Sequence, residues 1–223
     1  MAQYVSRTDQ TGHDVSRVDQ AKRVEPAVST IANPVPLGLS AMAFTTAIIG
    51  CSYAGFIIPS IRAGTSLAIG AALFYGGLVQ ILAGMWEFRK NNTIAATIFT
   101  SYGGFLVAFG AVFMPGFGIF SILNNGALLH QALGLFFLCW TIFTGVLLLS
   151  SLRTNAALIL TLLLLFIGYL LLTIGQLAGA NTVLLAIGGW FAVACALVGW
   201  YTALAGMLDS TNSPVKLPMG WIG

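Results

Sequence analysis

The chain has 223 residues, of which 58% are hydrophobic and 7% are charged, and its formal net charge is +3. A soluble domain carries about 25% charged residues, so this composition excludes a water-soluble fold and indicates an integral membrane protein. No basic patch suggests a nucleic-acid partner. The three cysteines, Cys51, Cys139 and Cys195, lie inside apolar runs without metal-ligand spacing, so we expect no metal and no other cofactor.

The first 30 residues form a polar segment, which we expect to be a disordered cytoplasmic tail. A short pattern repeats within it, because VSRTDQ from Val5 recurs as VSRVDQ from Val15. The segment lacks the apolar centre of a signal peptide, so we expect the first membrane helix to direct insertion. A regulatory or partner-docking role for this tail is the alternative to simple disorder.

Six apolar segments follow, and each is long enough to cross a bilayer as a helix. They cover residues 37–58, 64–86, 93–114, 128–151, 155–178 and 181–208. Proline, glycine, asparagine or charged residues separate them. We therefore predict an all-α integral membrane protein whose six transmembrane helices form one domain over residues 31–208, followed by a short cytoplasmic tail over residues 209–223.

Lysine and arginine near the predicted helix ends set the expected orientation in the cell membrane. With six spans, one side of the membrane carries both termini and the second and fourth loops. Its basic residues near the membrane are Lys22, Arg23, Arg89, Lys90, Arg153 and Lys216, and the other side has Arg62 alone. Because basic residues concentrate on the cytoplasmic side, we expect both termini to be cytoplasmic.

Small residues recur every four positions in the second, third and sixth segments. Such rows let helix backbones approach closely in lipid. The rows are Ala68, Ala72, Gly76 and Gly84; Ala96, Thr100, Gly104 and Ala108; and Gly188, Ala192 and Ala196. They serve packing within one chain or between subunits, and the sequence leaves both possibilities open.

The predicted helices contain uncharged polar side chains but no charged residue at mid-membrane depth. Hydroxyl groups can bond to their own helix, whereas Gln80, Tyr102 and Gln176 need partners from other helices or from water. No HExxH, GxSxG or P-loop motif is present, so we do not expect an enzyme. A neutral lining of hydroxyls, amides and aromatic rings suits the passage of a small solute.

The loop after the second segment allows two interpretations. Glu87, with Arg89 and Lys90, forms either a salt-bridged turn or a vestibule whose cations attract anions. Asn92 and Thr93 resemble a helix N-cap, and the exposed N–H groups of that helix end would favour a carboxylate.

Two further positions near helix ends also allow two interpretations each. Asn33 precedes Pro34 and Pro36, which hold the chain extended and then begin the first helix, so its amide either caps a helix or contacts the solute. His130 opens the fourth segment and is either an interfacial histidine with satisfied hydrogen bonds or a pH sensor.

Two sequence blocks resemble the acetate uptake transporter family, the succinate–acetate permease group. The first is NPVPLGLS, residues 33–40, and the second is FYGGLVQILAGMWEFRKNNTIAATIFTSYGGF, residues 74–105. The resemblance covers about residues 32–208. This chain departs from the usual residues at a few positions, of which Met42 in place of phenylalanine is the one expected to alter pore width or substrate range.

The resemblance implies a homo-hexamer in which each subunit has its own path for acetate and other short monocarboxylates. Succinate is a further substrate in some members, and transport is often linked to protons. By the same resemblance, the path narrows at a pore constriction formed by Met42, Tyr102 and Leu165. The other residues expected along the path are Asn33, Phe44, Thr45, Gln80, Glu87, Asn92, Thr93, Thr100, Ser101 and Gln176.

At the constriction we expect Tyr102 to give a hydrogen bond to the carboxylate while Met42, Leu165 and Phe44 contact the methyl end. Desolvation of an ionised carboxylate is costly, so passage needs either a protonated solute or a full set of hydrogen-bond donors. Two other classes remain open: a passive channel for small uncharged solutes, and a receptor or structural oligomer that transports nothing.

Overall fold

A computed structural model describes residues 31–57, 61–123 and 126–220, apart from the side chains of Ile61, Arg62 and Thr65. The tail expected over residues 1–30 therefore lies outside the described residues. The described residues from Asn33 onward belong to one compact unit, Asn33–Gly223.

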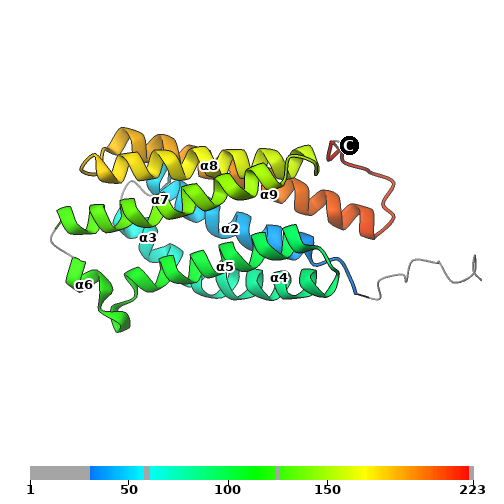
Figure 1. Cartoon of the computed structure of the whole chain (residues 1–223), viewed down its shortest axis with the longest axis horizontal. Helices are drawn as coiled ribbons and strands as arrows, with labels where there is room; N and C mark the ends of the chain where they lie inside the picture. The colour runs from blue at the N-terminus through cyan, green and yellow to red at the C-terminus, as the bar shows by residue number, and fades with distance from the viewer. Residues whose placement is uncertain (1–30, 58–60, 124–125, 221–223) are drawn as a thin grey trace, which may run out of the picture. The chain divides into compact units, whose positions relative to one another are not determined.

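Six helices in the described ranges are long and apolar enough to cross a membrane, as the sequence predicts (Figure 1). Five are single helices: α2 (Val35–Ala54), α5 (Thr93–Phe113), α7 (Ala127–Ser150), α8 (Ala156–Leu177) and α9 (Thr182–Ser210). The second span is composite and consists of α3 (Ile61–Gly70), the π-helix η1 (Ala71–Val79) and α4 (Gln80–Arg89). The largest difference from expectation is the end of the first span, expected at 58 and found at Ala54.

The short η2 (Pro115–Phe117) and α6 (Ile119–Leu123) connect α5 to α7. No β-strand occurs in the described part of the chain, so the protein is an all-helical, multi-pass membrane protein.

Helix α2 lies at the centre of the bundle. It packs against α9 on one side and against α3, η1 and α4 on the other, while α7, α8 and α9 pack in sequence and α4 packs against α5. Figure 1 shows α8 and α9 on one side of the view and α4 and α5 on the other, with α2 between them. The core therefore lies around α2, between two groups of helices.

Asparagine side chains begin three of the membrane helices. The Oδ1 atom accepts a hydrogen bond from a backbone N–H of the first turn in each case: Asn92 from Ala95, Asn155 from Leu158, and Asn181 from Val183 and Leu184. These bonds satisfy N–H groups that have no partner within the helix. Helix α2 instead begins at two prolines and ends at Gly55, whose φ is +67°.

Most of the small-residue rows serve packing within the chain. A Cβ added to Gly84 would meet Thr100 of α5, and one added to Gly188 would meet Leu172 of α8 at 3.1 Å. Gly104 differs, because nothing lies within 4 Å of the Cβ it would carry. The rows of the second and sixth segments therefore hold helices together, whereas part of the third row faces outward.

The C-terminal segment returns to the first turn of α8. The N–H groups of Ala156 and Ala157 donate to the carbonyl oxygens of Gly220, at 2.7 Å, and Met219, at 3.3 Å. Tyr201 of α9 also donates its hydroxyl to the Pro218 carbonyl at 2.8 Å. This segment therefore supplies acceptors to the N–H groups of a helix end that would otherwise need water.

Candidate functional site

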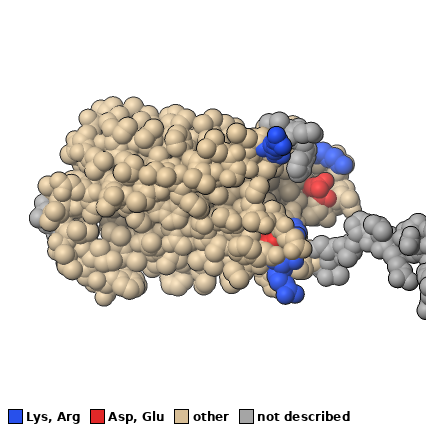
Figure 2. All heavy atoms as spheres, viewed as in Figure 1, with Lys and Arg blue, Asp and Glu red and all other residues tan. Residues whose placement is uncertain are grey.

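The charged side chains gather at one end of the helices. Figure 2 shows them on the visible face at the end where the α4–α5 turn lies in Figure 1. At this turn Glu87 is fully buried, and its Oε1 accepts from Lys90 Nζ at 3.4 Å. Its Oε2 accepts from Asn92 Nδ2 at 2.5 Å. Because a buried carboxylate needs such partners, these bonds form the salt-bridged turn that the sequence offered as one interpretation.

Asn33 reaches the same turn from the start of α2. Its Oδ1 accepts from Lys90 Nζ at 3.3 Å and from the Val35 N–H at 3.2 Å. Lys90 therefore connects Glu87 to Asn33 across a long sequence separation. Asn92 and Thr93 are exposed at this end, and Asn92 uses both ends of its amide, on Glu87 and on the first turn of α5.

The π-helix lies in the middle of the second span. Its wide turns leave carbonyl groups without the usual partner, and the hydroxyl of Thr45 in α2 donates to the Ala71 carbonyl at 3.2 Å. Gly76 permits this approach, because a Cβ there would collide with Thr45. The sequence prediction missed the π-helix, and the adjacent glycines of FYGG, Gly76 and Gly77, are the only signal that pointed to an unusual backbone.

Gln80 follows directly after the π-helix and is fully buried. Neither its Oε1 nor its Nε2 has a hydrogen-bond partner among the described residues, and the same holds for the Oγ1 of Thr100. A buried amide group without hydrogen-bond partners destabilises the folded protein by about 1–3 kcal/mol. This position therefore calls for water or a polar solute.

The three residues of the expected constriction come from three helices and belong to one buried core cluster: Met42 from α2, Tyr102 from α5 and Leu165 from α8. Tyr102 is 1% exposed, and its hydroxyl lies 2.8 Å from Thr144 Oγ1 on α7. Thr144 in turn donates to the Trp140 carbonyl at 2.6 Å. Because Thr144 has one proton to give, Tyr102 is the donor in this pair and its own proton is engaged.

A small internal cavity of about 20 Å³ lies beside the constriction. Leu165 lines it together with Thr46 of α2 and Tyr169 of α8. Neither Thr46 nor Tyr169 was among the expected path residues. Tyr169 lies one turn beyond Leu165 on the same helix, which is the spacing that could have indicated it.

Two of the expected path residues lie away from this interior. Phe44 is 43% exposed, and its ring packs edge-on against Tyr75 with centroids 5.6 Å apart. Ser101 lines an open groove on the side of the bundle with Gly104 and Trp140. The structure does not bring Phe44 or Ser101 together with the constriction.

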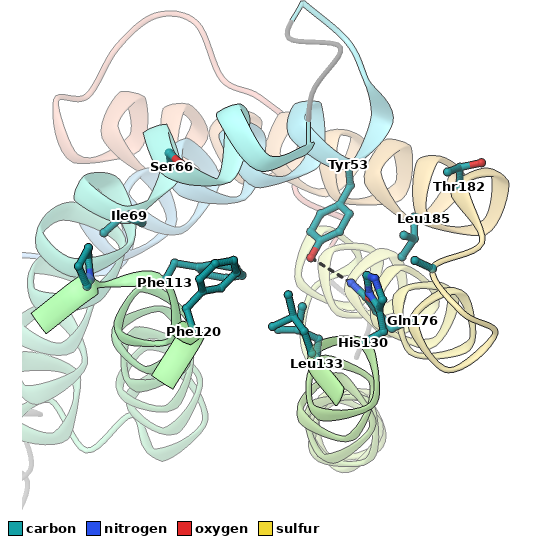
Figure 3. Close-up of a pocket in the computed structure, with 13 residues that line it drawn as sticks. Tyr53, Ser66, Ile69, Phe113, Phe120, His130, Leu133, Gln176, Thr182 and Leu185 are labelled. Carbon is teal, nitrogen blue, oxygen red and sulfur yellow. Dashed lines mark hydrogen bonds between the residues drawn. The ribbon is translucent and has the colours of Figure 1, made fainter. Parts of the chain in front are cut away.

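A cavity larger than the one beside the constriction lies at the end of the bundle opposite the charged turn, because α5 runs from that turn at Thr93 to this space at Phe113. It is a cavity of about 460 Å³ between the ends of α2, α5 and α8 and the starts of α7 and α9. Figure 3 shows Tyr53, Gln176 and His130 close together on one side, with Phe113 and Phe120 across the opening.

These three polar side chains form a chain of hydrogen bonds. His130 Nδ1 lies 2.7 Å from Gln176 Oε1, and Gln176 Nε2 donates to the Tyr53 hydroxyl at 3.5 Å. The sequence singled out Gln176 and His130 separately and missed Tyr53. Their positions in end turns of different helices could have suggested that the three meet.

The sequence matches the GPR1/FUN34/yaaH family over residues 19–222. Acetate permease A of Emericella nidulans is 43% identical over 201 residues, which are 84% of this chain and 65% of that protein. The succinate-acetate/proton symporter SatP of Escherichia coli K12 is 33% identical over 191 residues, 85% of this chain and 96% of that protein.

A solved structure, that of the bacterial acetate channel SatP, matches with a TM-score of 0.74 and 30% identity. The match covers 86% of this chain and 100% of that chain. This chain thus spans under two-thirds of the fungal permease but nearly all of the bacterial symporter.

Proposed function

We propose that this chain, which belongs to the GPR1/FUN34/YaaH family, transports acetate and other short monocarboxylates across a membrane, with succinate as a further candidate. The family membership confirms the resemblance found in the two sequence blocks. The observation that carries the proposal is the structural match over the whole of the acetate channel SatP. The relatives compared above are named as a permease, a symporter and a channel, which supports transport and not catalysis.

The proposed path runs along the interior of one subunit. It begins at the cavity beside Gln176, passes the constriction and Gln80, and ends at the turn that holds Glu87 and Asn33. Support comes from the unpartnered amide of Gln80, because a polar group without partners at membrane depth marks a water or solute position more often than a structural one. Loose, uncharged contacts of this kind let a solute enter and leave.

The constriction favours a neutral solute. Met42 and Leu165 are apolar, and the hydroxyl proton of Tyr102 is engaged by Thr144. A carboxylate ion there would lose its hydration without gaining a donor, which is strongly unfavourable. The protonated acid is therefore the form expected to cross, and this links transport to protons.

The organisation in the cell membrane is part of the same proposal. The excess of lysine and arginine supports cytoplasmic termini, with residues 31–208 as the membrane domain between tails over 1–30 and 209–223. A homo-hexamer is the proposed assembly, in keeping with the family resemblance.

Flux of labelled acetate into proteoliposomes tests the proposal. Gln80→Leu removes the unpartnered amide and is expected to lower acetate flux about two- to tenfold, the effect of one lost hydrogen bond to a neutral solute. Thr97→Val is the matched control, because the Thr97 hydroxyl bonds only to the Thr93 carbonyl of its own helix among the described residues. This control should leave the flux unchanged.

Three outcomes would count against the proposal. Flux no greater than that of empty vesicles indicates a receptor or structural protein. Water permeability by stopped-flow light scattering without acetate flux indicates a channel for uncharged solutes. Acetate flux that is unaffected by both Gln80→Leu and Tyr102→Ala means that the path runs elsewhere.

A further inference from the structure

We infer that the 460 Å³ cavity is a binding site for a monocarboxylate with a short alkyl chain, and that His130 and the bound carboxyl group share one proton. The inference deepens the proposed function, on which it rests, because it names a binding position, a ligand form and a selectivity that the family comparison does not supply.

The cavity has the size and lining of a ligand site. Small-molecule sites are concave, mostly apolar and about 300–1,000 Å³ in volume, with a few polar groups that orient the ligand. Here the apolar lining includes Phe113, Phe120 and Leu133, and Figure 3 shows Phe113 and Phe120 across the opening from the polar groups. The volume exceeds what a two-carbon acid needs, so the site accommodates a longer alkyl chain.

The hydrogen bonds of the polar wall determine which atoms are available to a ligand. Gln176 Oε1 can only accept, so His130 Nδ1 carries a proton and donates to it over 2.7 Å. Gln176 Nε2 donates to the Tyr53 oxygen at 3.5 Å, which leaves the hydroxyl proton of Tyr53 for another acceptor. His130 Nε2 has no hydrogen bond to any described residue and is the ring nitrogen left for a ligand.

None of the described residues that line the cavity is an Asp, Glu, Lys or Arg, so no such charge pairs with a bound carboxylate. Apart from His130, the titratable lining residue is Tyr53. Among the lining elements, α5, α7, α8, η2 and α6 contain no Asp, Glu, Lys or Arg, and their other titratable groups are Tyr102, Cys139 and Tyr169. Helix α2 adds Cys51, and α9 adds Cys195, Tyr201 and Asp209, but none of these side chains lines the cavity. Arg62 of α3 has a side chain outside the described residues. An unpaired carboxylate in such a cavity is strongly disfavoured.

These hydrogen-bond roles determine how many protons accompany binding of a monocarboxylate. With Nδ1 protonated, a neutral imidazole presents Nε2 as an acceptor, and a carboxylate ion also only accepts. The two can pair only if one proton is added, either on Nε2, giving imidazolium and carboxylate, or on the ligand, giving imidazole and carboxylic acid. Both forms contain the same atoms and the same net charge, so one proton accompanies each bound monocarboxylate.

The same geometry favours monocarboxylates over dicarboxylates, so succinate is expected to be a weaker ligand of this cavity than a monocarboxylate of the same length. The His130–Gln176–Tyr53 cluster occupies one side, whereas a second carboxylate at the far end of the ligand would lie against Phe113 and Phe120. That group would lose its hydration without a charged partner. A six-carbon monocarboxylate should therefore bind better than a dicarboxylate of the same length.

Isothermal titration calorimetry on the purified full-length chain in detergent tests this inference with two probes, hexanoate and adipate. Repeating each titration in buffers of different ionisation enthalpy counts the protons taken up. The wild type should bind hexanoate with net proton uptake that approaches one at pH 8, and more weakly at pH 8 than at pH 6, by at most about tenfold per pH unit. Adipate should bind at least about tenfold more weakly than hexanoate.

Substitutions of His130 test whether the proton uptake depends on this residue and not on another group. Asparagine in His130→Asn keeps an N–H near the position of Nδ1 but cannot gain a proton, so proton uptake should disappear and hexanoate affinity at pH 6 should fall at least about tenfold. His130→Gln is the second variant in case the first does not fold. Arg62→Gln is the control and should keep both the affinity and the proton uptake.

The first three contrary results below would overturn the inference. Proton uptake that persists in the folded His130 variants places the proton elsewhere, and loss of it in Arg62→Gln assigns the charge to Arg62. Equal binding of adipate and hexanoate removes the selectivity. Hexanoate binding without acetate flux in proteoliposomes would overturn only the proposed function, whereas acetate flux without hexanoate binding would overturn only this inference.

Discussion

The packing of α4 against α5 depends on the absence of a side chain at Gly103. A Cβ added there would lie 2.6 Å from Ile81 Cγ1, 2.8 Å from the Gly77 carbonyl oxygen and 2.9 Å from the Ile81 nitrogen. Two of these atoms belong to the backbone, so a rotamer change cannot relieve the overlap. The next residue, Gly104, has nothing within 4 Å of the same added atom. The two glycines therefore form a matched pair within one helix.

The expected magnitude comes from the difference between Gly103→Ala and Gly104→Ala. Overpacking of a close contact costs about 1–3 kcal/mol, and each substitution gains up to about 1 kcal/mol of helix propensity. Because both positions lie inside α5, the propensity gain cancels in the comparison. We expect Gly103→Ala to unfold with a free energy about 1–3 kcal/mol lower than Gly104→Ala.

Thermal and denaturant-induced unfolding in detergent, followed by tryptophan fluorescence, measures this difference. Gly104→Ala should be as stable as the wild type or up to about 1 kcal/mol more stable. A Gly103→Ala variant as stable as the wild type would refute the reasoning that backbone contact at Gly103 limits the α4–α5 distance. A Gly104→Ala variant less stable than the wild type would mean that another chain covers α5 at that point.

Three further changes have expected outcomes that the same unfolding measurement checks. Glu87→Ala removes the acceptor of Lys90 and Asn92 and should lower the free energy of unfolding by about 1.5–3 kcal/mol, the range for hydrogen bonds to a charged group; an unchanged value would mean that water replaces the carboxylate at no cost. Asn181→Ala removes the cap of α9 and should cost about 1 kcal/mol, with Asn181→Ser retaining most of the stability; an equal loss in the serine variant would contradict a capping role. Tyr102→Phe deletes one buried hydrogen bond and should cost about 1 kcal/mol, and a gain in stability would show that the bond to Thr144 is strained.

Several properties of this protein follow from the sequence alone. Length and hydropathy predicted six membrane helices, because a bilayer of fixed thickness requires about 20 apolar residues in each span. The asparagines at 92, 155 and 181 stand at helix starts for a local reason, since a cap is a contact between neighbouring residues. Motif spacing also indicated the family that the comparisons later established.

The sequence did not predict which residues of each helix face the interior of the bundle. A helix in a bilayer is apolar on every face, so hydrophobic periodicity does not distinguish the lipid side from the core side. That is why the outward position of Phe44 and the burial of Met42 on the same helix had to come from the structure. The π-helix is a further case, because its wider turn shifts the faces of the residues that follow.

Hydrogen bonds between distant residues were likewise decided by tertiary packing. Tyr102 meets Thr144, and Gln176 meets both His130 and Tyr53, across helices that are far apart in the sequence. No local rule selects these partners, because any polar group at membrane depth will pair with whatever donor or acceptor the fold brings near it. The sequence determined which polar groups enter the membrane, and the packing of α2, α5, α7 and α8 decided which of them are satisfied and which, like Gln80, are left for water or solute.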